Sequence, residues 1–135
     1  MKNVVTNAVR TPIGDFGCSL KAMKPIDLII AVMKDVLASA QLDKEAVDQV
    51  IIGNCIAPID QNVARVSSLM MGVPYEAPGY TINCACASAS QAISTALGYE
   101  NGEPEDSQVE FMGRPIHNLV DVFGNCNLFN LVFFK

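Results

Sequence analysis

The sequence predicts an α/β fold built in layers, and three observations support this prediction. Short runs rich in valine, isoleucine and threonine alternate with longer segments of helical periodicity, in the order βα-β-α-βα. Half of the 135 residues are apolar and 17% are charged, which is typical of a globular domain with a buried core. The purely apolar runs are far too short to span a bilayer. We therefore expect one globular, layered unit.

The first half of the chain carries three clear elements. Residues 3–9 are rich in valine and threonine and form a predicted strand that ends at a proline-containing loop. Residues 25–40 form a predicted helix that begins at Pro25, a favoured first-turn residue. The stretch QVIIGN, which begins at Gln49, is typical of a buried strand that ends at Gly53. The helix has one apolar stripe at steps of three and four residues, made of Ile26, Ile29, Ile30, Met33, Val36 and Leu37.

Three further elements follow. Residues 62–71 form a predicted helix, with Asn62 as the N-terminal cap that satisfies first-turn N–H groups. Residues 80–83 form a predicted strand, and residues 88–99 a helix of small side chains. Arginines in such settings more often anchor backbone carbonyls than bind anions, so we expect a structural role for Arg65.

The composition changes near residue 99 and divides the chain into two regions. Residues 1–99 hold the predicted elements, whereas residues 100–135 consist of an acidic, turn-rich linker and an apolar tail. The tail ends in the run from Leu128 to Phe134. Such a run suits a strand or helix that packs on a partner surface.

Charge and cysteine content argue against several classes of function. The net charge is −5 and the nine basic residues are scattered, so we expect no nucleic-acid partner. The N-terminus lacks the apolar core of a secretory signal, and we expect a cytoplasmic protein without membrane contact. The five cysteines are irregularly spaced and His117 is the only histidine, so we expect no metal site and no cofactor.

The stretch TINCACASAS places Cys84 and Cys86 one residue apart, between a predicted strand and a predicted helix. The two thiols could be metal ligands, a redox pair, packing residues, or a nucleophile and a bystander. Cys86 falls just before or at the helix N-terminus, where unsatisfied N–H groups and the helix dipole favour an anion such as a thiolate. Position alone leaves open a nucleophilic Cys86 and the packing role that most cysteines have.

Four segments, AVRTPIGDFGCSL, VDQVIIGN, QNVARVSSLMMGVP and TINCACASASQAI, resemble the thiolase family in their order and spacing. The family pattern Asn-x-x-Cys-x-Ser-Gly coincides with Asn83, Cys86 and Ser88. The resemblance implies part of the N-terminal βα half of the family's layered fold, a mixed sheet flanked by helices. It also implies that Cys86 is the catalytic nucleophile, that Cys84 is an unconstrained neighbour, and that acyl-CoA and CoA are substrates of a homo-oligomer.

The chain departs from the family pattern in several respects. Ala89 stands where the family has a glycine that lets the backbone turn tightly against the active site, so we expect the turn that carries Cys86 to be strained or shifted. A block of the family pattern after residue 99 is absent, and Met112 is the counterpart of a methionine that borders the family's acyl pocket. His117 inherits no catalytic role. The Gly-His-Pro and Cys-x-Gly-Gly motifs, which carry the family's histidine and second cysteine, are missing.

These features predict a thiolase-like acyltransferase that moves an acyl group between CoA thioesters through an S-acyl Cys86, forming or cleaving acetoacetyl-CoA. Because the family's base and acid are missing, we expect the chain alone to be inactive or nearly so. The alternative is a catalytically inactive, truncated thiolase-like chain that acts as a packing or interaction module. A third possibility is that the chain is one piece of a larger entity.

Overall fold

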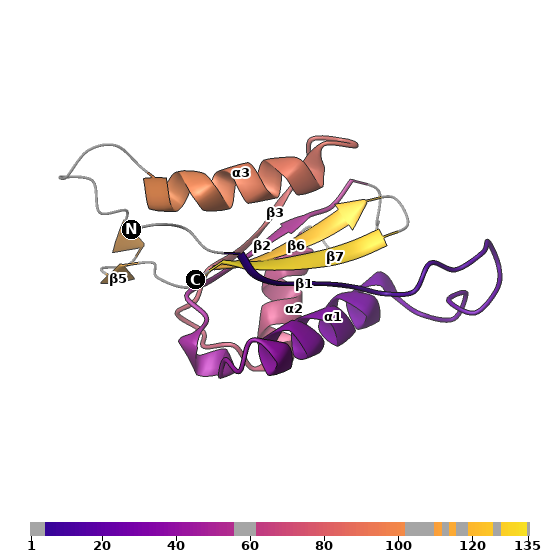
Figure 1. Ribbon diagram of the computed structural model, residues 1–135, viewed down its shortest axis with the longest axis horizontal. Helices are drawn as coiled ribbons and strands as arrows, with labels where there is room; N and C mark the ends of the chain where they lie inside the picture. The colour runs from indigo at the N-terminus through magenta and orange to yellow at the C-terminus, as the bar shows by residue number, and fades with distance from the viewer. Residues whose placement is uncertain are drawn as a thin grey trace.

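The computed structural model describes residues 5–55, 62–101, 110–111, 114–115, 119–125 and 128–134 (Figure 1). Each element predicted over residues 1–99 is present, with boundaries that agree to within two residues. The elements are β1 (Val5–Arg10), α1 (Pro25–Ser39), the 3₁₀ turn η1 (Lys44–Ala46), β2 (Gln49–Gly53), α2 (Val63–Met71), β3 (Gly79–Ile82), α3 (Ser88–Asn101), β4 (Glu110–Phe111), β5 (Arg114–Pro115), β6 (Leu119–Asn125) and β7 (Leu128–Phe134).

Within the described residues, five strands form one mixed sheet in the order β1-β7-β6-β2-β3. Strands β6, β2 and β3 are parallel to one another, whereas β7 is antiparallel to both of its neighbours, β1 and β6. Strands β4 and β5 form a separate antiparallel pair. Strand β3 therefore lies at one edge of the large sheet, and it leads directly into the segment with the two cysteines.

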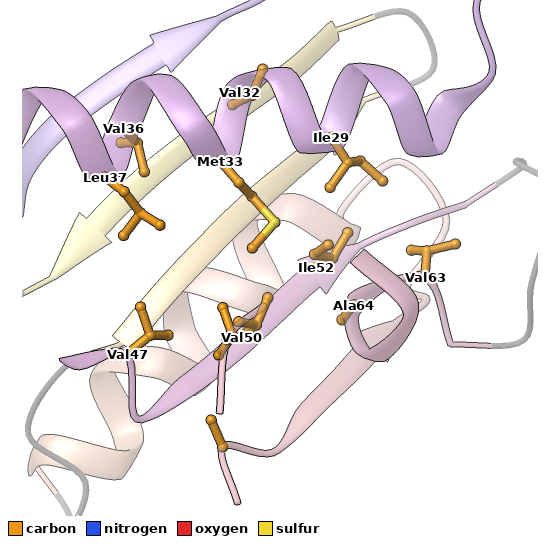
Figure 2. Close-up of a cluster of buried hydrophobic side chains, with 12 residues drawn as sticks. Ile29, Val32, Met33, Val36, Leu37, Val47, Val50, Ile52, Val63 and Ala64 are labelled. Carbon is orange, nitrogen blue, oxygen red and sulfur yellow. The ribbon is translucent and has the colours of Figure 1, made fainter. Parts of the chain in front are cut away.

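Helices cover both faces of the sheet, with α1 and α2 on one face and α3 on the other (Figure 1). Strand β2 shows why, because all five of its residues are buried and its side chains alternate between the faces. Val50 and Ile52 belong to the cluster that includes Met33 of α1 (Figure 2). Ile51 belongs to a second cluster with Ala92 and Ala96 of α3. The α/β architecture with a mixed sheet flanked by helices is thus the one that the sequence predicts.

Helix α1 buries the predicted apolar stripe with one exchange. Pro25 occupies the first turn, and the Asp27 carboxylate accepts the backbone N–H of Lys24 at 3.2 Å. Val32 is buried and Ile30 is only partly buried, so the buried face is rotated slightly from the predicted one. The buried residues of the helix are Ile26, Ile29, Val32, Met33, Val36 and Leu37.

The apolar tail is part of the large sheet. The run from Leu128 to Phe134 is a strand, one of the two forms predicted for it, and β7 pairs with β6 on one side and with β1 on the other. Packing of this run on a partner surface stays a prediction. The register places Val5 opposite Phe134, so the two ends of the sequence meet in one strand pair. Pairing between such distant segments leaves no local signal in the sequence, and strands from both sides of residue 99 share this sheet.

Polar contacts hold the start of α2 against β3. The Asn62 side chain caps α2 as predicted, since its Oδ1 accepts the Arg65 N–H at 3.1 Å, and its Nδ2 donates to the Gly79 carbonyl at 2.8 Å. The Thr81 hydroxyl donates to Asn62 Oδ1 at 3.1 Å and accepts the Ala64 N–H at 3.2 Å. These bonds fix the edge strand that leads into the two cysteines.

Candidate functional site

The candidate site lies where the parallel strands β2 and β3 end. In open α/β sheets, ligands bind at this end of the strands. The backbone N–H of Asn54 donates to the Ile82 carbonyl at 2.9 Å, and Asn83 Nδ2 donates to the Cys55 carbonyl at 3.5 Å. The chain segments that follow the two strands are therefore held together at this edge.

Residues 83–88, which we call the cysteine turn, connect β3 to α3. The Ala87 N–H donates to the Cys84 carbonyl at 3.0 Å, and the Ser88 N–H donates to the Ala85 carbonyl at 3.1 Å. Asn83 Oδ1 accepts the Ala85 N–H at 3.0 Å. The hydroxyl of the buried Ser88 accepts the Cys84 N–H at 2.9 Å and donates to the Ala85 carbonyl at 2.6 Å. Two of the residues that match the family pattern, Asn83 and Ser88, thus hold the backbone of this turn.

The strained residue of the cysteine turn is Ala85. Its φ is +50°, in the left-handed region that disfavours residues with a Cβ atom. The turn that carries Cys86 is therefore strained as expected, but the strain lies at Ala85 and not at Ala89, which is within α3 and has no positive φ. The physical reason is that the chain reverses at Ala85, before the helix begins.

Gly53 of β2 lies closely against the backbone at the start of α3. A Cβ atom at Gly53 would lie 2.6 Å from the carbonyl carbon of Ser88 and 2.7 Å from the backbone nitrogen of Ala89. Only glycine therefore fits between β2 and the first residues of α3. This role of Gly53 was not predicted, although a glycine at the end of a strand pattern is a signal of close backbone approach.

Cys84 and Cys86 are both exposed free cysteines. Cys86 lies two residues before α3 begins, at the place that the sequence predicts. The first N–H groups of a helix lack intrahelical partners and form the positive end of its dipole. This arrangement can present a thiolate to a ligand that approaches the ends of β2 and β3, and the nucleophilic role of Cys86 stays a prediction.

The other residues singled out from the sequence lie elsewhere. The Arg65 guanidinium donates to the carbonyls of Ala77 at 2.7 Å and Tyr75 at 2.9 Å, and lies 4.7 Å from the centroid of the Tyr75 ring. Its predicted structural role is therefore confirmed. Met112 and His117 lie outside the residues that the structure describes.

The described residues bear on the predictions about metals and membranes. Among these residues, no group of three or more histidine, cysteine, aspartate or glutamate side chains could hold a metal ion. In the same part of the chain, no helix combines the length and the apolar character needed to cross a membrane. The expectation of no metal and no cofactor stays a prediction.

Comparison with known proteins identifies relatives of residues 3–99, which match the family described as thiolase, N-terminal domain. The chain is 42% identical over 95 residues to the beta-ketothiolase BktB of Cupriavidus necator, and this match covers 69% of this chain and 24% of that protein. It is 40% identical over 98 residues to the acetyl-CoA acetyltransferase of Escherichia coli, a match that covers 71% of this chain and 25% of that protein. The chain spans about a quarter of the length of these relatives.

Solved structures resemble the fold over a larger share of the chain. The Acat5 thiolase of Ascaris suum in complex with coenzyme A has a TM-score of 0.76 and 28% identity, covering 91% of this chain and 30% of that protein. The acetyl-CoA acetyltransferase of Bacillus anthracis has a TM-score of 0.71 and 35% identity, and the match covers 89% of this chain and 28% of that protein. The likeness therefore includes strands beyond residue 99, although it spans less than a third of each of these proteins.

Proposed function

Because this chain belongs to the thiolase family, we propose that it carries the nucleophile half of an acyltransferase that moves acyl groups between CoA thioesters. The Cys86 thiolate attacks the thioester carbonyl, the bond to the CoA sulfur breaks, and the acyl group stays on Cys86 while CoA leaves as its thiolate, which takes a proton from solvent. A second acyl-CoA then receives the acyl group by Claisen condensation, or CoA receives it in the degradative direction. The observation that carries this proposal is the exposed Cys86 directly before α3.

The hydrogen bonds of the cysteine turn restrict which groups can stabilise the tetrahedral intermediate. The N–H groups of Cys84, Ala85, Ala87 and Ser88 all donate within the turn. The Gln91 N–H donates to the Ala87 carbonyl at 2.9 Å, so the donors that remain at this end of α3 are the N–H groups of Cys86, Ala89 and Ser90. We infer that the developing oxyanion is held there, at the positive end of the helix dipole.

The proposal includes several properties that follow from the family. Acyl-CoA and CoA are its substrates, and one structural neighbour was solved with coenzyme A. Met112 borders the acyl pocket, and the protein acts in the cytoplasm without nucleic-acid or membrane partners. A homo-oligomer forms through β3, and this proposal is supported by the position of β3 at the edge of the sheet, where its backbone can pair with a second copy.

We further propose that this chain alone does not complete the reaction cycle. The sequence contains neither a Gly-His-Pro nor a Cys-x-Gly-Gly motif, and its only histidine is His117. Losing a general base or a general acid costs about 10²–10⁴-fold in rate for each group. The expected activity is therefore formation of the S-acyl enzyme with little or no turnover.

The proposal is tested by incubating the full chain with acetyl-CoA and measuring its intact mass. We expect one acetyl group that hydroxylamine removes, as it does from thioesters. Cys84→Ser is the matched control, because it changes the other exposed thiol of the same turn and should keep the adduct. Cys86→Ser should lose it. An adduct that persists in Cys86→Ser would refute the assignment, and a folded chain that takes up no acetyl group would support the inactive packing module instead.

A further inference from the structure

The cysteine turn brings two exposed thiols close together in a conformation that is closed by hydrogen bonds. Cys84 and Cys86 are separated only by Ala85, whose φ is +50°, and the Ala87 N–H closes a turn onto the Cys84 carbonyl at 3.0 Å. In an extended strand, residues two apart are separated by roughly 6.6 Å between their Cα atoms. The reversal of the chain at Ala85 shortens this separation.

A disulfide needs cysteines at a short spacing. Bridged cysteines have Cα atoms about 4.4–6.8 Å apart, a range that two cysteines separated by one residue reach in a reversed turn. Both thiols are exposed, so a small oxidant can reach them. Cys18 is also exposed but lies in the loop between β1 and α1, which makes it a control thiol outside the turn.

We propose that Cys84 and Cys86 form a reversible disulfide, with a small-molecule disulfide such as oxidised glutathione as the electron acceptor. The Cys86 thiolate attacks one sulfur of oxidised glutathione, whose S–S bond breaks, and one glutathione leaves as a thiolate. Cys84 then attacks the Cys86 sulfur of the mixed disulfide, and the second glutathione leaves. The chain loses two electrons and two thiol protons, and one oxidised glutathione becomes two reduced ones.

The second step is favoured by proximity, because Cys84 is held one residue from the mixed disulfide and competes with free thiols at a high effective concentration. A disulfide across a single residue is exposed and strained, and disulfides of this kind are the easily reduced, regulatory ones. Oxidation would occupy the Cys86 sulfur and block acyl transfer. This last consequence depends on the proposed function, whereas formation of the disulfide does not.

The test uses the full chain treated with oxidised glutathione, blocked with iodoacetamide under denaturing conditions and cleaved after glutamate. Cleavage after Glu76 and Glu100 releases residues 77–100, which contain Cys84 and Cys86 and no other cysteine. We expect this peptide to carry neither alkyl nor glutathione groups, and to be lighter by two hydrogen atoms than the dithiol. After prior reduction with dithiothreitol, it should be alkylated at both cysteines.

Two variants complete the test. Cys84→Ser should keep a glutathione on Cys86, since the thiol that releases it is gone, whereas Cys18→Ser should behave as the unmodified chain does. The proposal is overturned if the peptide from the unmodified chain keeps glutathione, is alkylated at both positions, or is linked to Cys55 or Cys18. If the disulfide forms but acetyl-CoA leaves no adduct, the acyltransferase function is refuted and the disulfide stands. If the acetyl adduct forms but the disulfide does not, only the disulfide is refuted.

Discussion

Replacing Gly53 by alanine tests whether β2 positions the cysteine turn. The added Cβ would lie 2.6 Å from the carbonyl carbon of Ser88 and 2.7 Å from the Ala89 nitrogen, and both are backbone atoms. Carbon atoms in good contact are about 3.5–4.0 Å apart, so β2 and α3 must separate by about 1 Å. The start of α3 and the attached cysteine turn should move with this separation.

The size of the effect follows from two opposing contributions. Overpacking of this kind destabilises the folded state by about 1–3 kcal/mol. Alanine also restricts the unfolded chain more than glycine does, which stabilises the fold by about 0.4–1 kcal/mol. We expect Gly53→Ala to lower the free energy of unfolding by about 1–2 kcal/mol. With a urea m-value of about 1–3 kcal/mol/M, the midpoint of urea unfolding should fall by roughly 1 M.

Two measurements test this prediction. The first is urea unfolding of the full chain, and the second is the rate at which Cys86 of the native chain reacts with iodoacetamide. Gly14→Ala is the matched control, because its new Cβ would meet only the side chain of Leu20, at 3.1 Å, and a side chain can move aside. This variant should stay within about 0.5 kcal/mol of the unmodified chain. If Gly53→Ala is equally neutral and Cys86 reacts at an unchanged rate, the close approach between β2 and α3 does not position the turn.

Three further predictions concern the turn, a helix cap and the core, and each is checked by urea unfolding. Ala85→Gly should stabilise the chain by up to about 1 kcal/mol, because it relieves the positive φ, whereas Ala87→Gly in the same turn should destabilise it. If both variants change the free energy of unfolding in the same direction, Ala85 is not strained. Asn62→Ala should cost about 0.5–2 kcal/mol through loss of the α2 cap, and Asn62→Ser, which keeps a capping oxygen without placing a charge against the Gly79 carbonyl, should cost less. Met33→Ala should cost about 2–5 kcal/mol because the side chain is 1% exposed, whereas Met70→Ala, 60% exposed, should be nearly neutral. Similar losses for both would argue against the core in Figure 2.

Local signals account for the parts of the fold that could be predicted. Helix α1 follows from apolar residues at steps of three and four, and its first turn follows from Pro25. The cap of α2 depends on Asn62 and an N–H three residues later. The position of Cys86 before α3 also lies within one strand-to-helix connection. Each of these features involves residues a few positions apart, so the sequence itself contains the physical cause.

By itself, then, the sequence determined the α/β class, the elements up to residue 99 and the placement of Cys86. Only the tertiary structure decided that β7 lies between β1 and β6, that Gly53 meets the backbone of Ser88, and that Ala85 takes the positive φ. The first two depend on contacts between segments far apart in the chain, and the third depends on how β3 must reverse to place α3 against β2. Such contacts are chosen by the packing of the whole sheet, and no local run of residues specifies them.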